Sequence, residues 1–448
     1  MTAHAQFPGS RRSLTLLLWL TAALSLANWC AAADLTHPAK ATLRESSRQC
    51  RQILKTSVID FYLPACLDRT HGGYLEWMEA DRFVAQGEKF LTLQARQIWF
   101  FSTLASRGVE KESALAAART GFEFLQAKFR DPTHGGYYAK VSDAGEPRDK
   151  RKHVYLNAFA LYALSAYYRA TNAPEALEAA QALFQTLEKK AHDAGRGGYL
   201  EFFEEDWQPI LDRNVQSFIG PGGTKTFNTH LHVMEAFAEL YRVWPDPLVR
   251  QRLDELILVN TQTVRLPAFG CNVDAFTLEW EPLQTPQNLR ASYGHDIECA
   301  WLVLDASRTL GHSPKLLRGW AEGLVGYSLR HGFDRQQGGF FYTGALGKPA
   351  DDTTKTWWVQ AEGLVALLEM YRLTGEPLYF DKFQKTLQFV AQHQVAPGGS
   401  WWASCDAAGK PLNSIKTSMW QGAYHNGRAM LLCIDLLEEL AEGRRPTP

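Results

Sequence analysis

The sequence predicts an all-α protein, an (α/α)6 barrel of twelve antiparallel helices with long loops and short strands on one rim. Five glycine-pair loops recur along the chain, as HGGYLEW at Gly72, HGGYYAK at Gly135, RGGYLEF at Gly197, QGGFFYT at Gly338 and PGGSWWA at Gly398. Their steps are 63, 62, 141 and 60 residues, and a degenerate copy at Gly270 (FGCNVDAF) divides the long step. Repetition at a fixed period indicates a stacked or closed repeat architecture. Each unit is long enough for two helices, so six units give twelve.

Helical spacing of apolar residues supports this count. The predicted helices lie near residues 40–63, 89–107, 111–129, 153–171, 173–191, 226–243, 246–264, 294–309, 312–331, 355–374, 377–394 and 418–440. Short turns alternate with long loops, and the long loops carry the glycine pairs. Because neighbouring helices are antiparallel, all long loops must share one rim. The glycines suit turns with positive φ, and a functional cleft is expected on that rim.

The chain has 448 residues and no linker-like segment, so residues 34–448 are expected to form one catalytic domain. Residues 1–33 resemble an export signal peptide, with Arg11-Arg12, an apolar stretch from Leu14 to Ala27, and small residues before Asp34. The double arginine also resembles a twin-arginine signal. We therefore expect an exported, periplasmic or extracellular protein without a stable membrane span.

The net charge of −1 gives no general attraction to nucleic acid or anionic membranes. Six cysteines remain after the signal, too few for a disulfide framework. Cys50 and Cys66 are a possible pair, although ordinary core thiols are the favoured interpretation. A monomer or weak dimer is expected.

Unusual polar and aromatic residues fall in the early turns of every second helix, where the long loops end. They are Gln94, Arg96, His153, Tyr155, Asn157, Asn228, His230, His232, Glu235, His295, Asp296, Glu298, Trp357, Trp358, Gln360, Glu362, Trp420, His425, Asn426 and Arg428. The barrel topology would bring them together. Four pairs have helical spacing that places them on shared faces, namely Asn228–His232, His295–Glu298, Trp358–Glu362 and His425–Arg428. His230 falls on another face than His232, so we expect a structural role for it.

Several histidines suit proton transfer on a neutral polyhydroxylated ligand, and an arginine and flat tryptophan rings suit its binding. Such a ligand is a mono- or disaccharide. His295 and Glu298 are also conceivable metal ligands. However, the chain has no His-Glu-x-x-His helix, cysteine pair or acidic cluster. Gly220–Lys225 lacks the spacing of a phosphate-binding loop. We expect neither a metal nor a cofactor.

Four segments resemble the N-acylglucosamine 2-epimerase superfamily, closest to its cellobiose 2-epimerase branch. They are KTFNTHLHVMEAFAELYRVW (225–244), SYGHDIECAWLVLDA (292–306), KTWWVQAEGLVALLEMY (355–371) and MWQGAYHNGR (419–428). The resemblance implies cofactor-independent epimerisation at C2. Glucose and mannose would interconvert at the reducing end of β-1,4-linked disaccharides or oligosaccharides through a cis-enediol.

The resemblance also implies residue roles. His295 and His425 would exchange the C2 proton, and His232 would assist ring opening or support the site. The sugar-binding set would comprise Arg96, Tyr155, Asn228, Glu298, Trp357, Trp358, Glu362, Trp420 and Arg428. The loop from His71 to Lys89 departs from the branch, which leaves the preference for a disaccharide open. An aldose–ketose isomerase, a glycoside hydrolase or lyase, and a non-catalytic carbohydrate-binding protein are the alternatives.

Overall fold

The computed structural model describes residues 35–79 and 81–443. The expected export signal, residues 1–33, lies outside the described residues. From Ala39 onward the chain forms one compact unit. Within the described residues, no helix combines the length and the apolarity needed to cross a membrane.

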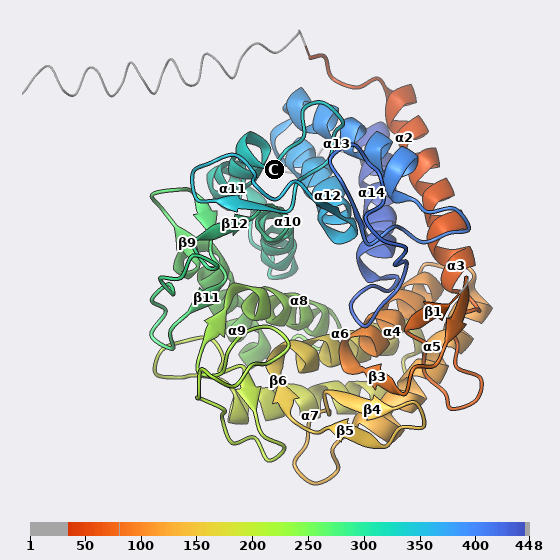
Figure 1. The fold of residues 1–448 in the computed structure, drawn as a ribbon, viewed down its shortest axis with the longest axis vertical. Coiled ribbons are helices and arrows are strands. Elements are labelled where there is room, and N and C mark those ends of the chain that lie inside the picture. Colours follow the sequence, from red (N-terminus) through yellow and green to blue (C-terminus); the bar gives the residue numbers. More distant parts are fainter. Residues whose placement is uncertain (1–34, 80, 444–448) are drawn as a thin grey trace, which may run out of the picture. The chain divides into compact units, whose positions relative to one another are not determined.

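Six inner helices form a closed ring (Figure 1). They are α4 (Leu91–Ser106), α6 (Val154–Thr171), α8 (Phe227–Val243), α10 (Tyr293–Thr309), α12 (Trp357–Thr374) and α14 (Tyr424–Ala441). Each contacts the next, and α14 contacts α4. These helices are buried on nearly all sides, as in α4, where every residue from Leu91 to Ala105 is buried. Their sequences are accordingly apolar around the whole helix, which is typical of a helix inside a large core.

Six outer helical segments cover this ring and bury only one face. They are α2 (Lys40–Ile53) continued by η1 (Leu54–Ile59) and α3 (Asp60–Tyr62), α5 (Lys111–Phe124) with η2 (Leu125–Phe129), α7 (Pro174–Lys190), α9 (Pro247–Leu258) with η3 (Val259–Thr263), η4 (Pro314–Leu317) with α11 (Arg318–His331), and α13 (Pro377–Phe389) with η5 (Val390–Gln394). In α7, for example, Ala180, Leu183 and Leu187 face inward while the charged residues face outward. The predicted (α/α)6 barrel of twelve helices is therefore confirmed.

Eleven of the twelve predicted helices begin and end within two residues of the observed segments. The exception is the last, which was expected from residue 418 but begins at Tyr424. The preceding residues form an irregular loop because Gly422 packs directly against α4, where an added Cβ would lie 2.8 Å from Leu93 Cδ1. Trp420 therefore belongs to a loop rather than to the helix.

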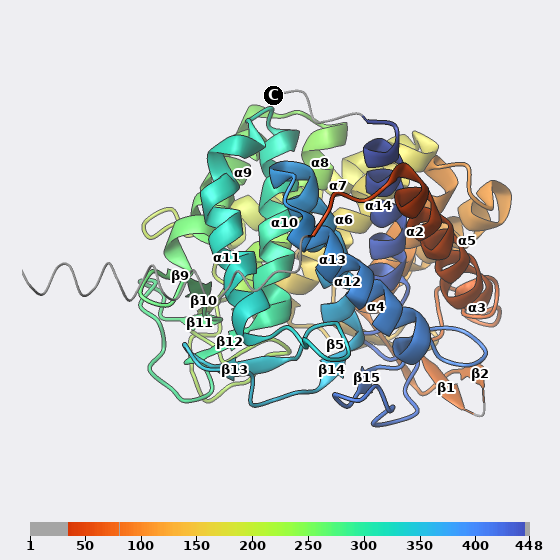
Figure 2. The same cartoon turned by 90° about the horizontal axis from the view of Figure 1, so that it is seen from above.

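Short strands gather on one rim (Figure 2). The strand before each of the first five inner helices pairs with a strand that follows the next glycine loop, as in β3–β4, β6–β7, β8–β11, β12–β13 and β14–β15. The strands are β1 (Trp77–Glu79), β2 (Arg82–Val84), β3 (Glu88–Phe90), β4 (Lys140–Ser142), β5 (Pro147–Asp149), β6 (Lys152–His153), β7 (Phe202–Phe203), β8 (Lys225–Thr226), β9 (Arg265–Leu266), β10 (Cys271–Asn272), β11 (Ala275–Phe276), β12 (Arg290–Ser292), β13 (Thr343–Ala345), β14 (Lys355–Thr356) and β15 (Ser404–Cys405). These pairings join consecutive repeats and hold the loops over the inner helix starts.

The glycine pairs make tight turns in which both residues have positive φ, at 69° for Gly73 and 70° for Gly198. A side chain would also collide, since a Cβ on Gly198 would lie 2.6 Å from His230 Nε2. The degenerate sixth copy behaves similarly, because Gly270 has φ of 81° and joins β9 to β10. The positive φ therefore favours glycine in each of these turns, and the close contact adds a second reason at positions such as Gly198 but not at Gly270.

Buried lysine–aspartate pairs fix four of these loops, a feature that the sequence analysis did not identify. Each lysine lies just before an inner helix, and its Nζ binds the aspartate that opens the glycine loop. The pairs are Lys89–Asp68 (2.7 Å), Lys152–Asp131 (2.7 Å), Lys225–Asp193 (2.9 Å) and Lys355–Asp334 (2.7 Å). The buried charges are thus compensated within each repeat.

The cysteines of the described residues are buried free thiols. Cys50 and Cys66 are both among these free thiols, and Cys50 interacts with Cys433, whose pKa it raises. The possible Cys50–Cys66 pair is therefore not formed. Instead, two thiols meet where α2 packs on α14.

Candidate active site

A cavity of about 520 Å³ opens among the rim loops, above the starts of the inner helices. Ten of the twelve residues expected in the site line it, namely Arg96, Tyr155, Asn228, His232, His295, Glu298, Trp357, Trp358, Trp420 and His425. Glu362 and Arg428 do not line it but lie beneath, fully buried. The cavity is large enough for a small ligand.

One polar side chain per repeat faces its glycine loop instead of the cavity. In four repeats it accepts a hydrogen bond from the backbone N–H that follows the glycine pair; these residues are Gln94, Asn157, His230 and Gln360. Asp296 accepts from Asn272 N, and Gln421 donates to the carbonyl of Trp401. His230 also binds the Thr226 carbonyl through Nδ1, in keeping with the structural role expected for it.

His153 likewise caps a helix rather than reaching the cavity. Its Nδ1 accepts from the N–H of Tyr155 at 3.1 Å, and its Nε2 lies 3.1 Å from Ser217 Oγ. Burial lowers the pKa of His153 to about 3, so the ring is neutral at pH 7. Therefore only some of the polar residues at the helix starts line the cavity.

Arg428 forms the floor beneath the cavity. Its guanidinium donates to three carboxylates, with Nη2 at 2.9 Å from Glu298 and 2.8 Å from Glu362, and Nη1 bonded to Glu235. Its plane lies over the ring of Tyr424 at 4.1 Å. Helical spacing places Glu298 on the same face as His295, but the side chain of Glu298 binds Arg428 instead.

Two carboxylates of this floor orient histidines. Glu362 Oε1 lies 2.6 Å from Nδ1 of His425, and Glu235 Oε2 lies 2.9 Å from Nδ1 of His232. A proton on each Nδ1 makes these hydrogen bonds and leaves Nε2 as the free base, so a carboxylate partner selects the tautomer. Burial lowers the pKa of both imidazoles, and for His425 the charges of Arg96 and Arg428 add to this. Both rings are therefore neutral at pH 7.

His295 makes no hydrogen bond with Glu298 but packs on Trp358, with ring centroids 4.7 Å apart. Burial lowers its pKa to about 3. The same Trp358 ring lies 5.9 Å from His425. One tryptophan thus contacts both histidines, and both line the cavity.

The three buried glutamates differ in how strongly they hold a proton. Arg428 outweighs burial for Glu235 and lowers its pKa to about 2, so this group is ionised. For Glu298, burial and the charge of Glu362 raise the pKa well above its usual value. Burial also raises the pKa of Glu362, and because one guanidinium cannot balance three buried carboxylates, Glu298 is the one of the three that most favours its protonated form. The Oε2 atom of Glu298 has no hydrogen-bond partner in the protein, and Glu298 is one of the residues that line the cavity.

Arg96 is the one arginine or lysine among the described residues that line the cavity. Its Nη2 donates to the hydroxyl of Tyr155 at 3.0 Å, and its Nη1 donates to the carbonyl of Trp420 at 2.8 Å. The rings of Phe159 and Tyr424 lie 4.3 and 4.7 Å from the guanidinium. This packing holds the charge in place beside the cavity.

Glu298, Glu362 and His425 also have the geometry of a metal-ligand cluster. However, Arg428 already donates to both carboxylates, and Glu362 accepts from Trp301 Nε1 at 2.9 Å as well. A cation at this point would compete with a fixed guanidinium. The donor set therefore fits an arginine-centred network better than a metal site.

Further lining residues come from the loops, and the sequence analysis missed them. They are Phe218, Ile219, Tyr342, Asp352, Thr354, Thr356, Ala403 and Ser404. Phe218 packs edge-on against Phe90 at 5.0 Å, so the long loop before α8 reaches the cavity. An apolar Phe-Ile pair within a glycine-rich loop is the signal that could have identified it.

The comparison with known proteins agrees with this arrangement. The family model for N-acylglucosamine 2-epimerase matches residues 73–429. The chain is 31% identical over 406 residues to a cellobiose 2-epimerase of Bacteroides fragilis, covering 86% of this chain and 97% of the relative. A structure of cellobiose 2-epimerase from Spirochaeta thermophila superposes with a TM-score of 0.80 at 31% identity, covering 89% of this chain and 98% of the other. A D-mannose isomerase, with a TM-score of 0.75 at 20% identity, shares the fold. The chain belongs to the N-acylglucosamine 2-epimerase family of carbohydrate epimerases.

Proposed function

We propose that this protein interconverts glucose and mannose at the reducing end of β-1,4-linked disaccharides or oligosaccharides by epimerisation at C2. The observation that carries this proposal is that His295 and His425, both neutral, line one cavity and contact the same Trp358. Two bases on different helices can face opposite sides of one carbon. The similarity to cellobiose 2-epimerases supports the choice of substrate.

In the proposed reaction, His232 assists opening of the sugar ring to the aldehyde. One of the two imidazoles, His295 or His425, then takes the C2 proton through its free nitrogen. The C–H electrons form a C1–C2 double bond, and the carbonyl electrons move to O1 to give a cis-enediolate. The first imidazolium then releases its proton to solvent, and the other imidazole takes one up from solvent. It delivers this proton to the opposite face of C2, so that only the configuration changes.

Several features of the cavity suit this intermediate. Arg96 places a positive charge beside it, and all six inner helices direct their N-termini towards this rim, where their dipoles favour negative charge. Glu362 stabilises the imidazolium that forms if His425 accepts the proton. Glu298 Oε2 and Asn228 Oδ1 are buried without protein partners, and they are suited to bind sugar hydroxyls.

The same geometry disfavours hydrolysis. Glycoside hydrolysis usually needs two carboxyl groups that flank the scissile bond. Glu298 and Glu362 instead bind the same Nη2 of Arg428, and so they lie together in the cavity floor. Neither is placed to act from the opposite side of a sugar.

Incubation with cellobiose, mannobiose, glucose and mannose in heavy water tests the proposal. We expect cellobiose to yield its 2-epimer, with deuterium at C2 of the recovered sugars by NMR. Products that are only ketoses would identify an aldose–ketose isomerase. Release of monosaccharide would identify a hydrolase, and sugar binding without turnover would identify a binding protein.

We also propose that residues 1–33 direct export and that the mature chain begins at Asp34. The support is the order of Arg11-Arg12, an apolar stretch and small residues before Asp34. N-terminal sequencing of the full-length protein from the periplasmic fraction of a bacterial host should start at Asp34. An uncleaved chain found only in the cytoplasm would contradict export.

A further inference from the structure

Ion pairs join the inner helices at the rim opposite the sugar cavity, where these helices end. They are Arg169–Glu239 (2.6 Å), Arg242–Glu239 (3.0 Å), Arg242–Asp305 (2.5 Å), Arg308–Glu369 (3.0 Å), Arg372–Glu439 (3.2 Å) and Arg107–Asp435 (2.7 Å). They connect α6 to α8, α8 to α10, α10 to α12, α12 to α14, and α14 to the end of α4. We call this set the basal ion-pair ring.

The ring is interrupted at one place. Within residues 35–79 and 81–443, no ion pair joins α4 to α6. The residues on either side of this break are Arg107 and Arg169, which are both positive. Each is bound to a carboxylate only on its far side, Asp435 or Glu239, so the position between them lacks a negative charge.

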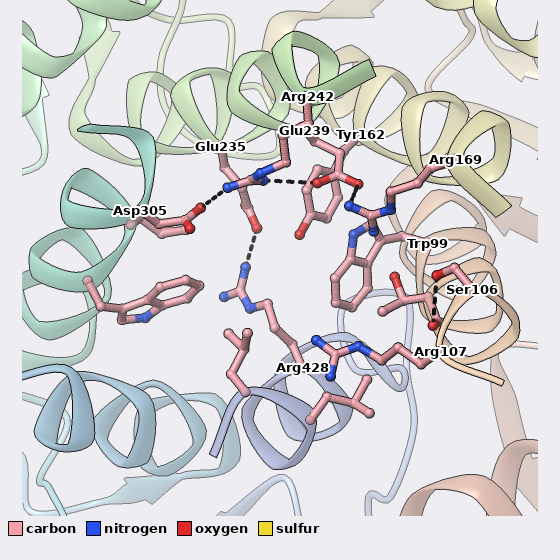
Figure 3. A pocket seen from close by; sticks show the side chains of 15 residues that line it. Trp99, Ser106, Arg107, Tyr162, Arg169, Glu235, Glu239, Arg242, Asp305 and Arg428 are labelled. Atoms are coloured by element: carbon pink, nitrogen blue, oxygen red, sulfur yellow. Dashed lines mark hydrogen bonds and ion pairs between the residues drawn. The ribbon is translucent and has the colours of Figure 1, made fainter. Parts of the chain in front are cut away.

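A second cavity, of about 550 Å³, lies at this break (Figure 3). Arg107, Arg169 and Trp99 are among its lining residues, and Figure 3 shows the three side chains on the same side of it. The carboxylates that line the cavity, Glu235, Glu239 and Asp305, are bound to Arg428, Arg169 and Arg242. The cavity is separate from the sugar cavity, since Arg428 and Glu235 line this one alone.

Two buried hydrogen-bond donors at the break have no protein partner. The indole Nε1 of Trp99 and the hydroxyl of Thr103 are both unsatisfied, although these residues are only 5% and 4% exposed. Both side chains line the cavity. Arginine in the last turn of a helix is favourable in itself. That preference does not account for the missing carboxylate or for the unsatisfied donors, because buried polar groups are normally paired.

We propose that this basal cavity is a second ligand site, specific for a small oxyanion such as a carboxylate or phosphate group. The anion would lie between Arg107 and Arg169 and complete the basal ion-pair ring. Planar guanidinium groups bind such oxyanions through paired hydrogen bonds. The Trp99 N–H and the Thr103 hydroxyl would supply the remaining donors. A bound anion would also lie in the same cavity as Glu235 and Arg428, which hold His232 and support His425.

Titration of the full-length protein with inorganic phosphate, and separately with malonate, tests this site by calorimetry and thermal unfolding. Ionic strength is kept constant with sodium chloride. We expect saturable binding and a higher Tm. Arg169→Gln and Arg107→Gln should each weaken binding by at least about tenfold, because each removes a charged hydrogen-bond donor. Arg308→Gln, in the same ring but away from the break, is the matched control and should bind normally.

Thr103→Val removes one donor at nearly constant volume and should also weaken binding if an arginine variant fails to fold. Equal binding by all of these variants, or no saturation, would overturn the proposal. Binding that Arg96→Gln abolishes and Arg169→Gln preserves would also overturn it, because the anion would then occupy the sugar cavity.

Discussion

The carboxylate of Glu362 fixes the imidazole of His425, with Oε1 lying 2.6 Å from Nδ1. The same carboxylate is held by Arg428 and by the indole of Trp301, so it cannot rotate away. The contact therefore selects the tautomer of His425 and directs its other nitrogen away from the floor. It also offers a counter-charge when that nitrogen is protonated.

Replacing His425 with Asn should lower turnover by roughly 10²- to 10⁴-fold, the usual loss when a general acid–base group is removed. Sugar binding should persist because Arg96 and the tryptophans remain. Turnover of cellobiose and calorimetric sugar affinity are the measurements. His230→Asn is the control. It removes a buried histidine that does not line the cavity and whose Nε2 accepts a hydrogen bond from the N–H of Tyr199. That variant should lose stability but keep activity in its folded fraction; a folded and inactive protein would mean that the histidine roles are wrongly assigned.

Glu235→Gln and Glu298→Gln should affect stability unequally, although both residues bind Arg428. Glu235 is ionised, and neutralising it leaves Arg428 poorly compensated, so we expect a loss of about 3 kcal/mol or more. Glu298 favours its protonated form, which glutamine resembles, so the loss should stay within about 1 kcal/mol. Urea unfolding of both variants measures the difference. Equal losses would mean that the proton is not on Glu298.

The activity should persist in acid further than the ordinary histidine pKa of 6.5 suggests. Burial lowers the pKa of His295 to about 3 and that of His425 well below 6.5. A base acts only when deprotonated, so kcat/KM is lost as the pH falls through the lowered pKa. We expect little change in kcat/KM between pH 8 and pH 6. A fall centred at 6.5, in protein that circular dichroism shows to be folded, would contradict this.

The contribution of Glu76 and Glu201 to stability should decline as the pH rises from acid to mildly alkaline values. Both accept hydrogen bonds at the start of an inner helix, and burial raises the pKa of each to about 8 from 4.5. A raised folded pKa stabilises the protein below pH 4.5, and this contribution is lost as the pH rises through 8. Glu76→Gln should flatten the pH dependence by roughly 1 kcal/mol per pH unit over this range. Glu79→Gln, at an exposed strand position, is the control and should leave the curve unchanged.

The fold was predictable from the sequence because its signals are local. Glycine pairs at a constant period and apolar helical faces placed eleven helices within two residues of their observed bounds. The last helix was placed too early because the residues before Tyr424 continue the apolar spacing. In the structure they form a loop, in which Gly422 packs against Leu93.

The site was predictable in composition but not in its contacts. Gln94 and Arg96 are two residues apart at the start of α4 and therefore lie on different faces, but spacing does not say which of them faces the glycine loop and which the cavity. The rotation of a helix about its axis depends on neighbouring repeats, which helical spacing does not encode. Similarly, spacing paired Glu298 with His295, while its actual partner, Arg428, lies 130 residues away in the sequence.

Closure of the helix ring has a consequence for folding. Most contacts join helices of the same or adjacent repeats, but α2 and α14 meet from opposite ends of the barrel sequence, as in the Ser47–Glu438 hydrogen bond across 391 residues. Contacts of such long separation are costly in chain entropy and tend to form late. The sugar cavity takes His425 from α14 and Arg96 from α4, so it is complete only after closure. Partly assembled barrels would therefore contain stable repeats without a functional site, and activity should report on the last step of folding.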